Sequence, residues 1–406
     1  MRKIYWSLLF IWASFFARAQ NPDSSYKQEI IKKTEIEIAF SYYNQDGDHS
    51  AVTGGTGTEK LLVYAPHLKI NHSFNDHHAI SLSGGADFIT SASKDNIDFV
   101  KSSASLHDTR SWLNAGYSYK FKGKELILDG GAGFSIESAY LSEQAKIGVE
   151  YTEPSKMRSY QFDIQAYFDD LRWGRLSRDY GRPVRLVYPV ELRYKDWYDT
   201  YRRNSYNFKF GFTQVLDKRT ILGIYPEVDY QRGLLATSYH RVYFTDGSLK
   251  VENLPENRLK FPVGIQFNHF TGGRVILKGN WQFYWDNFGI FGNAFRIEAA
   301  IKINPVLTIV PIYRFYIQKG ARYFAPYKEH NPSETYYTCD FDLSSFNSNE
   351  AGILLVYAPE KYLIRSGRIS EVNLQYNYFI RTNGLYAHYL TFWVTFDFEK
   401  RKRSRM

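Results

Sequence analysis

Cysteine is almost absent from this 406-residue chain, and its absence excludes several kinds of site. With Cys339 as the one cysteine, no disulfide can form within the chain, and no zinc or iron–sulfur centre can be built from its cysteines. Long apolar runs are also scarce beyond residue 19, and the mean hydropathy is −0.42. Since a spanning helix needs roughly 20 apolar residues, helical membrane spans are not expected.

The first nineteen residues have the three parts of a secretory signal peptide. Arg2 and Lys3 supply the positive start, residues 4–16 are apolar, and an A-x-A cleavage signal ends at Ala19. The apolar part is too short for a membrane anchor. We therefore expect residues 1–19 to be removed on export.

The formal charge of +9 is concentrated at the two ends of the chain. Three basic residues lie in the leader and five in residues 399–406, so the remainder is nearly neutral. Nucleic-acid binding needs a basic face on the fold and is not expected. The basic tail is interpreted as a solvated end.

Aromatic residues are abundant, at 18% of the chain, and they alternate with polar residues over long stretches. In residues 386–398, Leu390 and Phe392 fall on one face of a strand, whereas Thr391 and Thr395 fall on the other. Alternation with many aromatics is typical of a membrane barrel that is apolar outside and polar inside. We predict an all-β fold, a closed transmembrane antiparallel β-barrel of 14 to 16 strands, with 16 favoured; a soluble β-sandwich is the alternative.

Turn signals divide the chain into hairpins. Short turns are expected at Asn75–His78, Lys122–Lys124, Leu216–Arg219, Thr271–Gly273 and Asn304–Pro305, and longer loops near 44–59, 91–107, 170–182, 231–258 and 319–349. The predicted organisation is a signal peptide (1–19), a short periplasmic segment (20–34), the barrel (35–398) and a tail (399–406). The last strand ends on Phe398, as barrel-assembly signals do.

Several segments resemble one family of uncharacterised Gram-negative outer-membrane proteins, classed as a domain of unknown function. They are residues 43–59 (YNQDGDHSAVTGGTGTE), 87–98 (DFITSASKDNID), 235–244 (LATSYHRVYF), 284–290 (YWDNFGI), 313–318 (YRFYIQ) and 321–326 (ARYFAP). The family's Trp-Gly-Ile appears here as Phe288-Gly289-Ile290. The resemblance implies an outer-membrane barrel encoded near flavin-transferase-like and thioredoxin-like proteins.

Residues 46–57 are rich in oxygen ligands and glycine. Asp46 and Asp48 could coordinate a hard cation such as Ca²⁺, although the segment lacks the third acid and the bidentate Glu of an EF-hand loop. The alternative is a tight turn or an inward-folded loop, whose glycines allow close approach of the backbone.

The segment Asp87 to Ser93 resembles the pattern at which flavin transferases attach FMN. Asp87 would be its acid and Ser93 the acceptor, but Ser91 replaces the usual glycine. A serine-rich strand end is the alternative.

The sequence predicts a non-enzymatic outer-membrane barrel that serves as a pore or as a scaffold for an envelope partner. The alternatives are an envelope redox component, flavinylated or enclosing a redox protein, and an outer-membrane hydrolase. No cofactor is expected apart from the FMN and Ca²⁺ hypotheses. The expected partners are outer-membrane lipid, the barrel-assembly machinery, and periplasmic redox proteins or a flavin transferase.

Overall fold

The computed structural model describes residues 33–91, 107–137, 140–171, 201–237, 240–359, 362–364 and 367–399. The long strands are β1 (Lys33–Asp46), β2 (Leu61–Ser73), β3 (His78–Ser91), β4 (His107–Lys120), β5 (Leu126–Glu137), β6 (Tyr140–Thr152), β7 (Arg158–Asp170), β8 (Arg202–Asp217), β9 (Thr220–Gly233), β12 (Asn257–Gly272), β13 (Val275–Asp286), β14 (Phe291–Lys302), β15 (Leu307–Lys319), β16 (Phe346–Tyr357), β18 (Gly367–Arg381) and β19 (Tyr386–Glu399). A short strand, β17 (Tyr362–Ile364), pairs with the start of β18.

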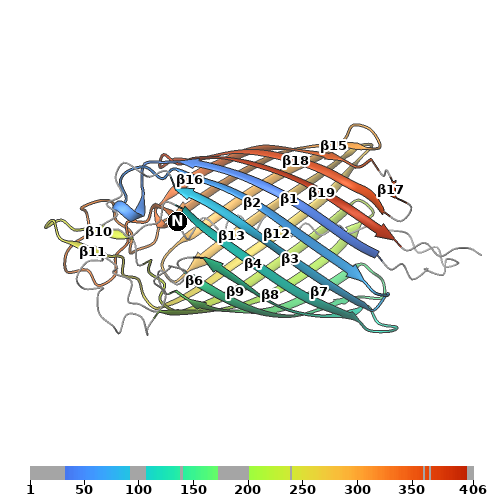
Figure 1. The fold of residues 1–406 in the computed structure, drawn as a ribbon, viewed down its shortest axis with the longest axis horizontal. Helices are drawn as coiled ribbons and strands as arrows, with labels where there is room; N and C mark the ends of the chain where they lie inside the picture. The colour runs from blue at the N-terminus through green and yellow to red at the C-terminus, as the bar shows by residue number, and fades with distance from the viewer. Residues whose placement is uncertain are drawn as a thin grey trace, which may run out of the picture.

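These sixteen long strands of the described chain form one closed antiparallel sheet (Figure 1). Each strand pairs with its neighbours in the chain, and β1 also pairs with β19 from Lys33↔Glu399 to Asp46↔Tyr386. Closure gives each of these sixteen described strands a backbone partner on both sides. The predicted closed barrel, with sixteen strands, is confirmed.

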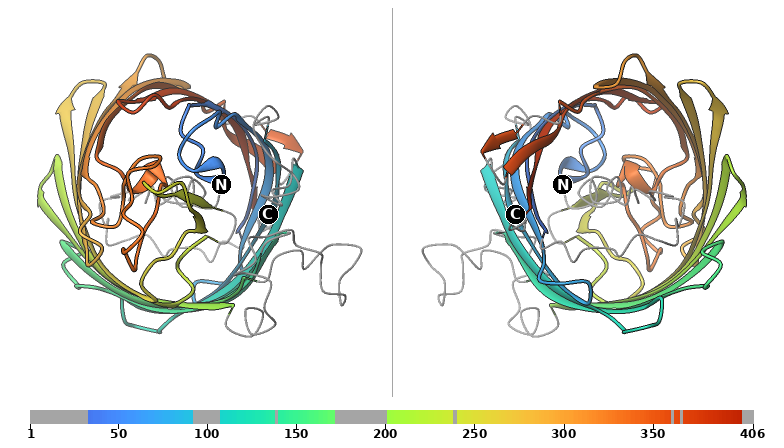
Figure 2. Two further views of the ribbon diagram at one scale, coloured as in Figure 1. Left: turned by 90° about the vertical axis from the view of Figure 1, so that its left-hand side faces the viewer. Right: turned by 90° about the vertical axis from the view of Figure 1, so that its right-hand side faces the viewer.

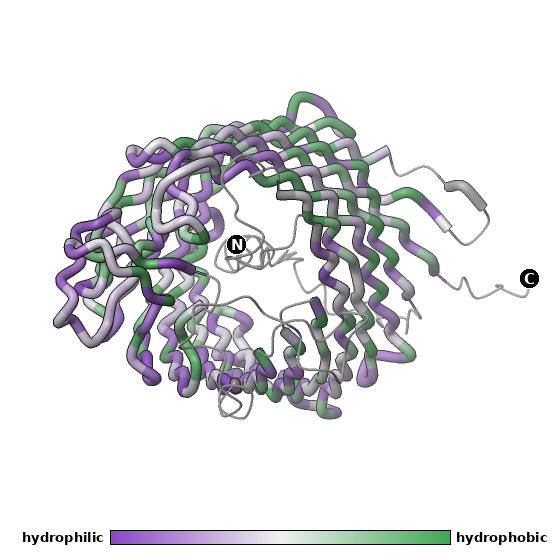
Figure 3. The backbone as a smooth tube through the Cα atoms, turned by 60° about the vertical axis from the view of Figure 1, so that its left-hand side comes forward, coloured by the Kyte–Doolittle hydropathy of each residue, from purple (hydrophilic) through white to green (hydrophobic). Residues whose placement is uncertain are grey.

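Alternate residues of each strand face outside and inside, and Figure 3 shows the resulting alternation of apolar and polar positions along the wall. On β19 the outward Phe392 is 43% exposed, whereas the inward Ala387 is fully buried. On β1 the outward Ile38 is 52% exposed, whereas Ala39 is 2% exposed. The faces predicted for residues 386–398 agree with the structure, and β1 shows the same alternation. No helix of the described residues is long and apolar enough to cross a bilayer.

The two ends of the barrel differ in their connections. The end where β1 begins and β19 finishes carries short turns at 74–77, 121–125, 153–157, 218–219 and 303–306, and a turn at Gly272–Arg274. The described strands of the barrel run from Lys33 to Glu399.

Three long connections gather at the opposite end, and we call them together the cap. They are the described residues of 47–60, 234–256 and 320–345. Figure 2 shows all three lying within the ring of strands when the barrel is viewed along its axis, and Figure 1 shows that the cap extends beyond the strand ends. The cap contains η2 (Ala51–Thr53), β10 (Arg241–Tyr243), β11 (Leu249–Val251) and η4 (Phe341–Leu343). It therefore covers one mouth of the barrel.

Candidate functional site

The cap has its own apolar core. This core is formed by Ala236, Leu254, Phe288, Ile290, Ala321 and Leu343, all of them buried. Phe288 and Ile290 come from the short turn between β13 and β14, so the core also joins the cap to the wall. Phe288 packs edge-on against Tyr323 at 5.3 Å, and the backbone amides of Phe288 and Ile290 both donate to Asp286, each at 3.0 Å.

Glycines let residues 47–60 pack tightly on the other two cap segments. Gly54 has φ +86°, and a Cβ there would lie 2.5 Å from the ring of Tyr243. At Gly55, with φ +84°, a Cβ would lie 3.0 Å from the Cys339 carbonyl oxygen. His49 stacks on Phe341 with ring centroids 3.8 Å apart. The inward-folded loop considered for this glycine-rich segment is therefore what the structure shows.

Backbone pairing ties 234–256 to 320–345. Asn253 and Tyr337 exchange two backbone hydrogen bonds, of 3.2 and 2.8 Å. The thiol of Cys339 donates to the Arg241 carbonyl at 2.7 Å. The cap is thus one packed unit made of three segments that are far apart in sequence.

The cap is fixed to the wall through β18. The guanidinium of Arg381 donates to the Asp342 carboxylate at 2.6 Å and to the Phe341 carbonyl at 2.7 Å, and it lies over the Phe346 ring. From β15, which lies on the far side of β16, the amide of Gln318 donates to the Asp342 and Ser344 carbonyls at 2.9 and 2.7 Å. These contacts hold η4 against the inner wall.

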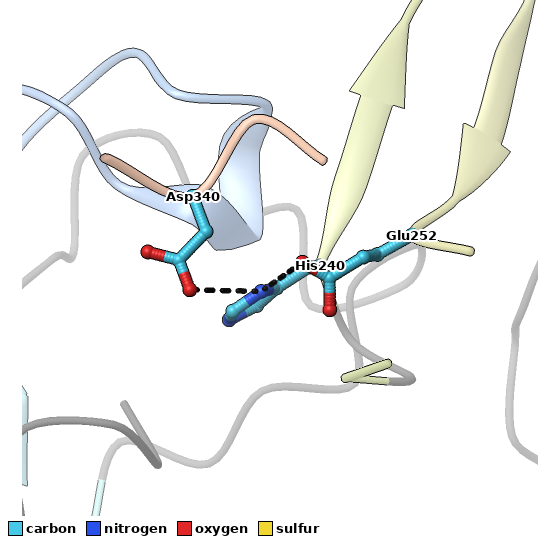
Figure 4. Close-up of side chains that lie close together, drawn as sticks. All are labelled: His240, Glu252 and Asp340. Carbon is cyan, nitrogen blue, oxygen red and sulfur yellow. Dashed lines mark ion pairs between the residues drawn. The ribbon is translucent and has the colours of Figure 1, made fainter. Parts of the chain in front are cut away.

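A cluster of three buried ionisable side chains lies inside the cap (Figure 4). His240 precedes β10, Glu252 follows β11, and Asp340 caps η4. His240 Nδ1 lies 3.5 Å from Glu252 Oε1 and 3.9 Å from Asp340 Oδ2, and one ligand atom from each residue lies within 4.8 Å of the others. Among the described residues, this is the group of three His, Cys, Asp or Glu side chains close enough to share an ion.

Neighbouring donors orient both carboxylates of this cluster. Glu252 accepts the Thr237 backbone amide on Oε2 and the Thr338 hydroxyl on Oε1, each at 2.5 Å. Asp340 Oδ1 accepts the Asp342 backbone amide at 2.9 Å, which leaves Oδ2 directed at His240. Imidazole and oriented carboxylates at this spacing are a donor set for a metal ion.

Glu59, at the end of the first cap segment, has a raised pKa. The pKa of this carboxyl is raised from about 4.5 to about 7, mainly by burial; the negative charges of Asp342 and Asp340 contribute to the rise, and Arg381 opposes it. The Glu59 backbone amide donates to the Gly47 carbonyl at 2.7 Å, so this residue also closes the loop. The cap therefore contains a carboxyl group that changes charge near neutral pH.

The inner wall carries charges of both signs, paired between neighbouring strands. These pairs include Asp87–Arg110, Asp163–Lys146, Asp169–Arg203, Glu227–Lys209, Asp286–Arg258, Glu350–Arg314 and Asp397–Arg368. Pairing reduces the cost of placing charge in a narrow space. The lumen is consequently polar along its length.

The structure places the predicted calcium ligands in a turn. Asp46, the last residue of β1, accepts the Gly47 amide at 2.9 Å and lies 3.7 Å from Lys60 Nζ, while Asp48 is exposed. These contacts are ordinary turn chemistry for an Asx residue. Calcium binding at this pair stays a prediction.

The predicted flavin site is described only in part. Asp87 lies on the inner face of β3, 3.5 Å from Arg110 Nη1, whereas Ser93 lies outside the described residues. Attachment of FMN to Ser93 therefore stays a prediction.

Sequence reasoning missed the cluster of His240, Glu252 and Asp340. Its members are separated by 12 and 88 positions in segments without periodicity, and no ligand motif has that spacing. The one available signal was a density of Tyr, Phe and His in long loops where charged residues would be more usual.

A closed antiparallel barrel with an apolar outer face, a charged lumen and loops over one mouth belongs to the class of porin-like outer-membrane β-barrels. Residues 98–370 match the family described as "Protein of unknown function (DUF3570)", and the chain belongs to this family. The resemblance to an uncharacterised family is thereby confirmed at the level of the family. No curated protein matches the chain.

Solved structures similar to this chain include a bacterial polysaccharide outer-membrane secretin, with 7% identity, TM-score 0.44, and coverage of 91% of this chain and 98% of that one. OpdK of Pseudomonas aeruginosa with vanillate has 9% identity, TM-score 0.41, and coverage of 91% and 98%. A BenF-like porin from Pseudomonas fluorescens Pf-5 has 8% identity, TM-score 0.42, and coverage of 90% and 99%. Nothing about the cargo of this chain follows from them.

Proposed function

We propose that this protein is a non-enzymatic outer-membrane channel for small hydrophilic solutes, with one mouth narrowed by its cap. The observation that carries this proposal is a polar, charge-lined lumen inside a closed barrel whose outer face is apolar. A barrel that served only as an anchor would not need ionised side chains along its inner wall, because burying charges costs free energy unless they are paired or hydrated. A water-filled path through the barrel would hydrate these side chains, and this accounts for ionised groups on the inner wall.

The orientation follows from the connections. Outer-membrane barrels have short turns on the periplasmic side and long loops outside. The short turns, the start of β1 and the end of β19 therefore face the periplasm, and the cap faces the exterior. A solute entering from outside meets the cap first, so the cap would set the size and charge of what passes.

Conductance in planar bilayers tests the channel. We expect a small conductance from the intact protein and a severalfold larger one when residues 241–251, which contain β10 and β11, are replaced by a short Gly-Ser linker. The matched control shortens the turn 153–157 at the opposite end, and we expect it to leave conductance unchanged.

Heat-modifiable mobility on gels shows that each barrel is folded before it is measured. If the intact and the shortened barrels are both folded and neither conducts, the channel proposal is wrong. A conductance that is equal in the intact and shortened barrels would show that the cap does not narrow the path.

A further inference from the structure

We propose that His240, Glu252 and Asp340 bind one divalent transition-metal ion of the Zn²⁺ type, and that this ion fastens two segments of the cap together. His240 and Glu252 belong to the segment 234–256, and Asp340 belongs to 320–345. A bound ion would therefore bridge the connection between β9 and β12 and the connection between β15 and β16.

The spacing of the donor atoms fits a small ion. His240 Nδ1 is 3.5 Å from Glu252 Oε1 and 3.9 Å from Asp340 Oδ2. Ligands about 2.0–2.2 Å from tetrahedral zinc lie about 3.3–3.6 Å from one another. Small side-chain rotations would bring the 3.9 Å separation between His240 and Asp340 into this range.

The surroundings also fit a metal site. The ligand carboxylates in metal sites accept hydrogen bonds from outer groups that fix their orientation. Here the Thr338 hydroxyl and the Thr237 amide hold Glu252, and the Asp342 amide holds Asp340. Each carboxylate still directs one oxygen at the imidazole.

Burial makes the charge of the cluster costly without a counter-ion. The side chains of His240, Glu252 and Asp340 are 3%, 0% and 8% exposed. Two carboxylates brought this close in a dry interior repel each other, and a dication removes that cost. The competing account is a cluster that holds no metal ion and lies beside the buried Arg241, whose Nη1 is 3.5 Å from the His240 carbonyl oxygen.

The donor set favours zinc over calcium. Imidazole nitrogen is a good ligand for Zn²⁺ and related ions, whereas Ca²⁺ takes six to eight oxygens. Three protein ligands leave a fourth position of a tetrahedral ion for water. In the channel proposed above, and only if that proposal holds, the ion would keep the cap closed over the mouth.

Metal content of the folded full-length protein tests the site. Protein stripped with chelator and dialysed against Zn²⁺ should retain about one zinc per chain by mass spectrometry, and excess Ca²⁺ should not displace it. Thr338→Val, which removes a donor to Glu252, should weaken zinc affinity about 10–100-fold. The isosteric variants Glu252→Gln and Asp340→Asn should retain no stoichiometric zinc.

His330 provides the matched control. It is buried in the same cap, bonded to Glu334 at 2.6 Å and to the Thr338 carbonyl at 3.0 Å, but it lies outside the cluster. His330→Ala should keep zinc, whereas His240→Ala should lose it. If His240→Ala does not fold, the two isosteric variants supply the same comparison.

Two results would overturn the proposal. One is a folded wild-type protein that retains no stoichiometric zinc, which would show that the cluster holds no metal ion. The other is equal zinc content in wild-type protein and in all ligand variants that fold, which would place the ion elsewhere. Because the readout is bound metal, its failure is separate from a failure to conduct.

Discussion

The wall and the cap of this barrel are held together by different means. In the wall, every long strand pairs with its neighbours through backbone hydrogen bonds. Most wall side chains need only be apolar on the outer face or polar on the inner face. In the cap, residues more than 80 positions apart are joined by individual side chains, such as Thr338 to Glu252. The wall should therefore tolerate most substitutions, whereas the cap should depend on a few residues.

The largest expected effect is truncation of the cap core. Phe288→Ala should cost the cap roughly 3–5 kcal/mol because a fully buried ring would leave a cavity. Limited proteolysis of the cap measures the loss, and heat-modifiable mobility reports on the wall. Phe295→Ala makes the same change on the outer face, where the ring is 49% exposed, and should leave the cap resistant. Equal cleavage of the cap in both variants would show that its stability does not depend on Phe288 more than on a residue of the outer wall.

The next largest expected effect comes from placing a charge on the outer face of the wall. Phe392→Arg places a charge on the outer face near the middle of β19 and should cost roughly 2–4 kcal/mol of folding free energy in the membrane. Thr391→Arg, one position away and facing the lumen, should fold nearly as well as the wild type. The fraction of heat-modifiable protein measures both. If the two variants fold equally poorly, the inside and outside faces have been assigned incorrectly.

Two glycine-to-alanine substitutions distinguish the cost of backbone strain from the cost of a packing clash. Gly54→Ala should loosen the cap by about 1–2 kcal/mol from its positive φ alone, with a further loss from the clash with Tyr243. Gly247→Ala, in the cap segment 234–256, has φ +81° and no atom within 4 Å of the added Cβ, so it shows the strain without the clash. Urea-dependent proteolysis of each variant gives the difference. No excess loss for Gly54→Ala would mean that the segment 47–60 is not tightly packed.

The smallest effect is a dependence of cap stability on pH. The pKa of Glu59 is about 7 in the fold and near 4.5 when unfolded, so its protonated form is favoured by folding. Its stabilising contribution is complete below about pH 4.5 and is lost as the pH rises through about 7. We expect the cap to resist protease better at pH 5 than at pH 8, by about 1 kcal/mol after solvent screening.

Glu59→Gln is the control for this pH dependence. The amide keeps the shape of the protonated carboxyl and has no charge to gain, so the variant should lose most of the difference between pH 5 and pH 8. A wild-type cap that is equally resistant at both pH values would contradict the account given for Glu59.

The wall was predictable from sequence and the interior of the cap was not. Alternation such as Thr391 with Phe392 gives both the strand and its faces, because a strand repeats every two residues. His240, Glu252 and Asp340 meet only because two irregular loops fold against each other, and no period records that meeting. The calcium prediction for Asp46 and Asp48 has a similar limit: an oxygen-rich segment is visible in the sequence, but the hydrogen bonds that Asp46 accepts from Gly47 and Thr58 are not.

The pairing of β1 with β19 means that the barrel closes between the two ends of its sequence. The first cap segment crosses this seam: a Cβ on Gly47 would lie 3.3 Å from the Cβ of Leu385, beside the start of β19. Arg381, on β18, then holds η4 of the third segment beside the same seam. The close approach of residues 47 and 385 exists only while β1 lies beside β19. The cap therefore reinforces the place where the cylinder closes, in addition to covering the mouth.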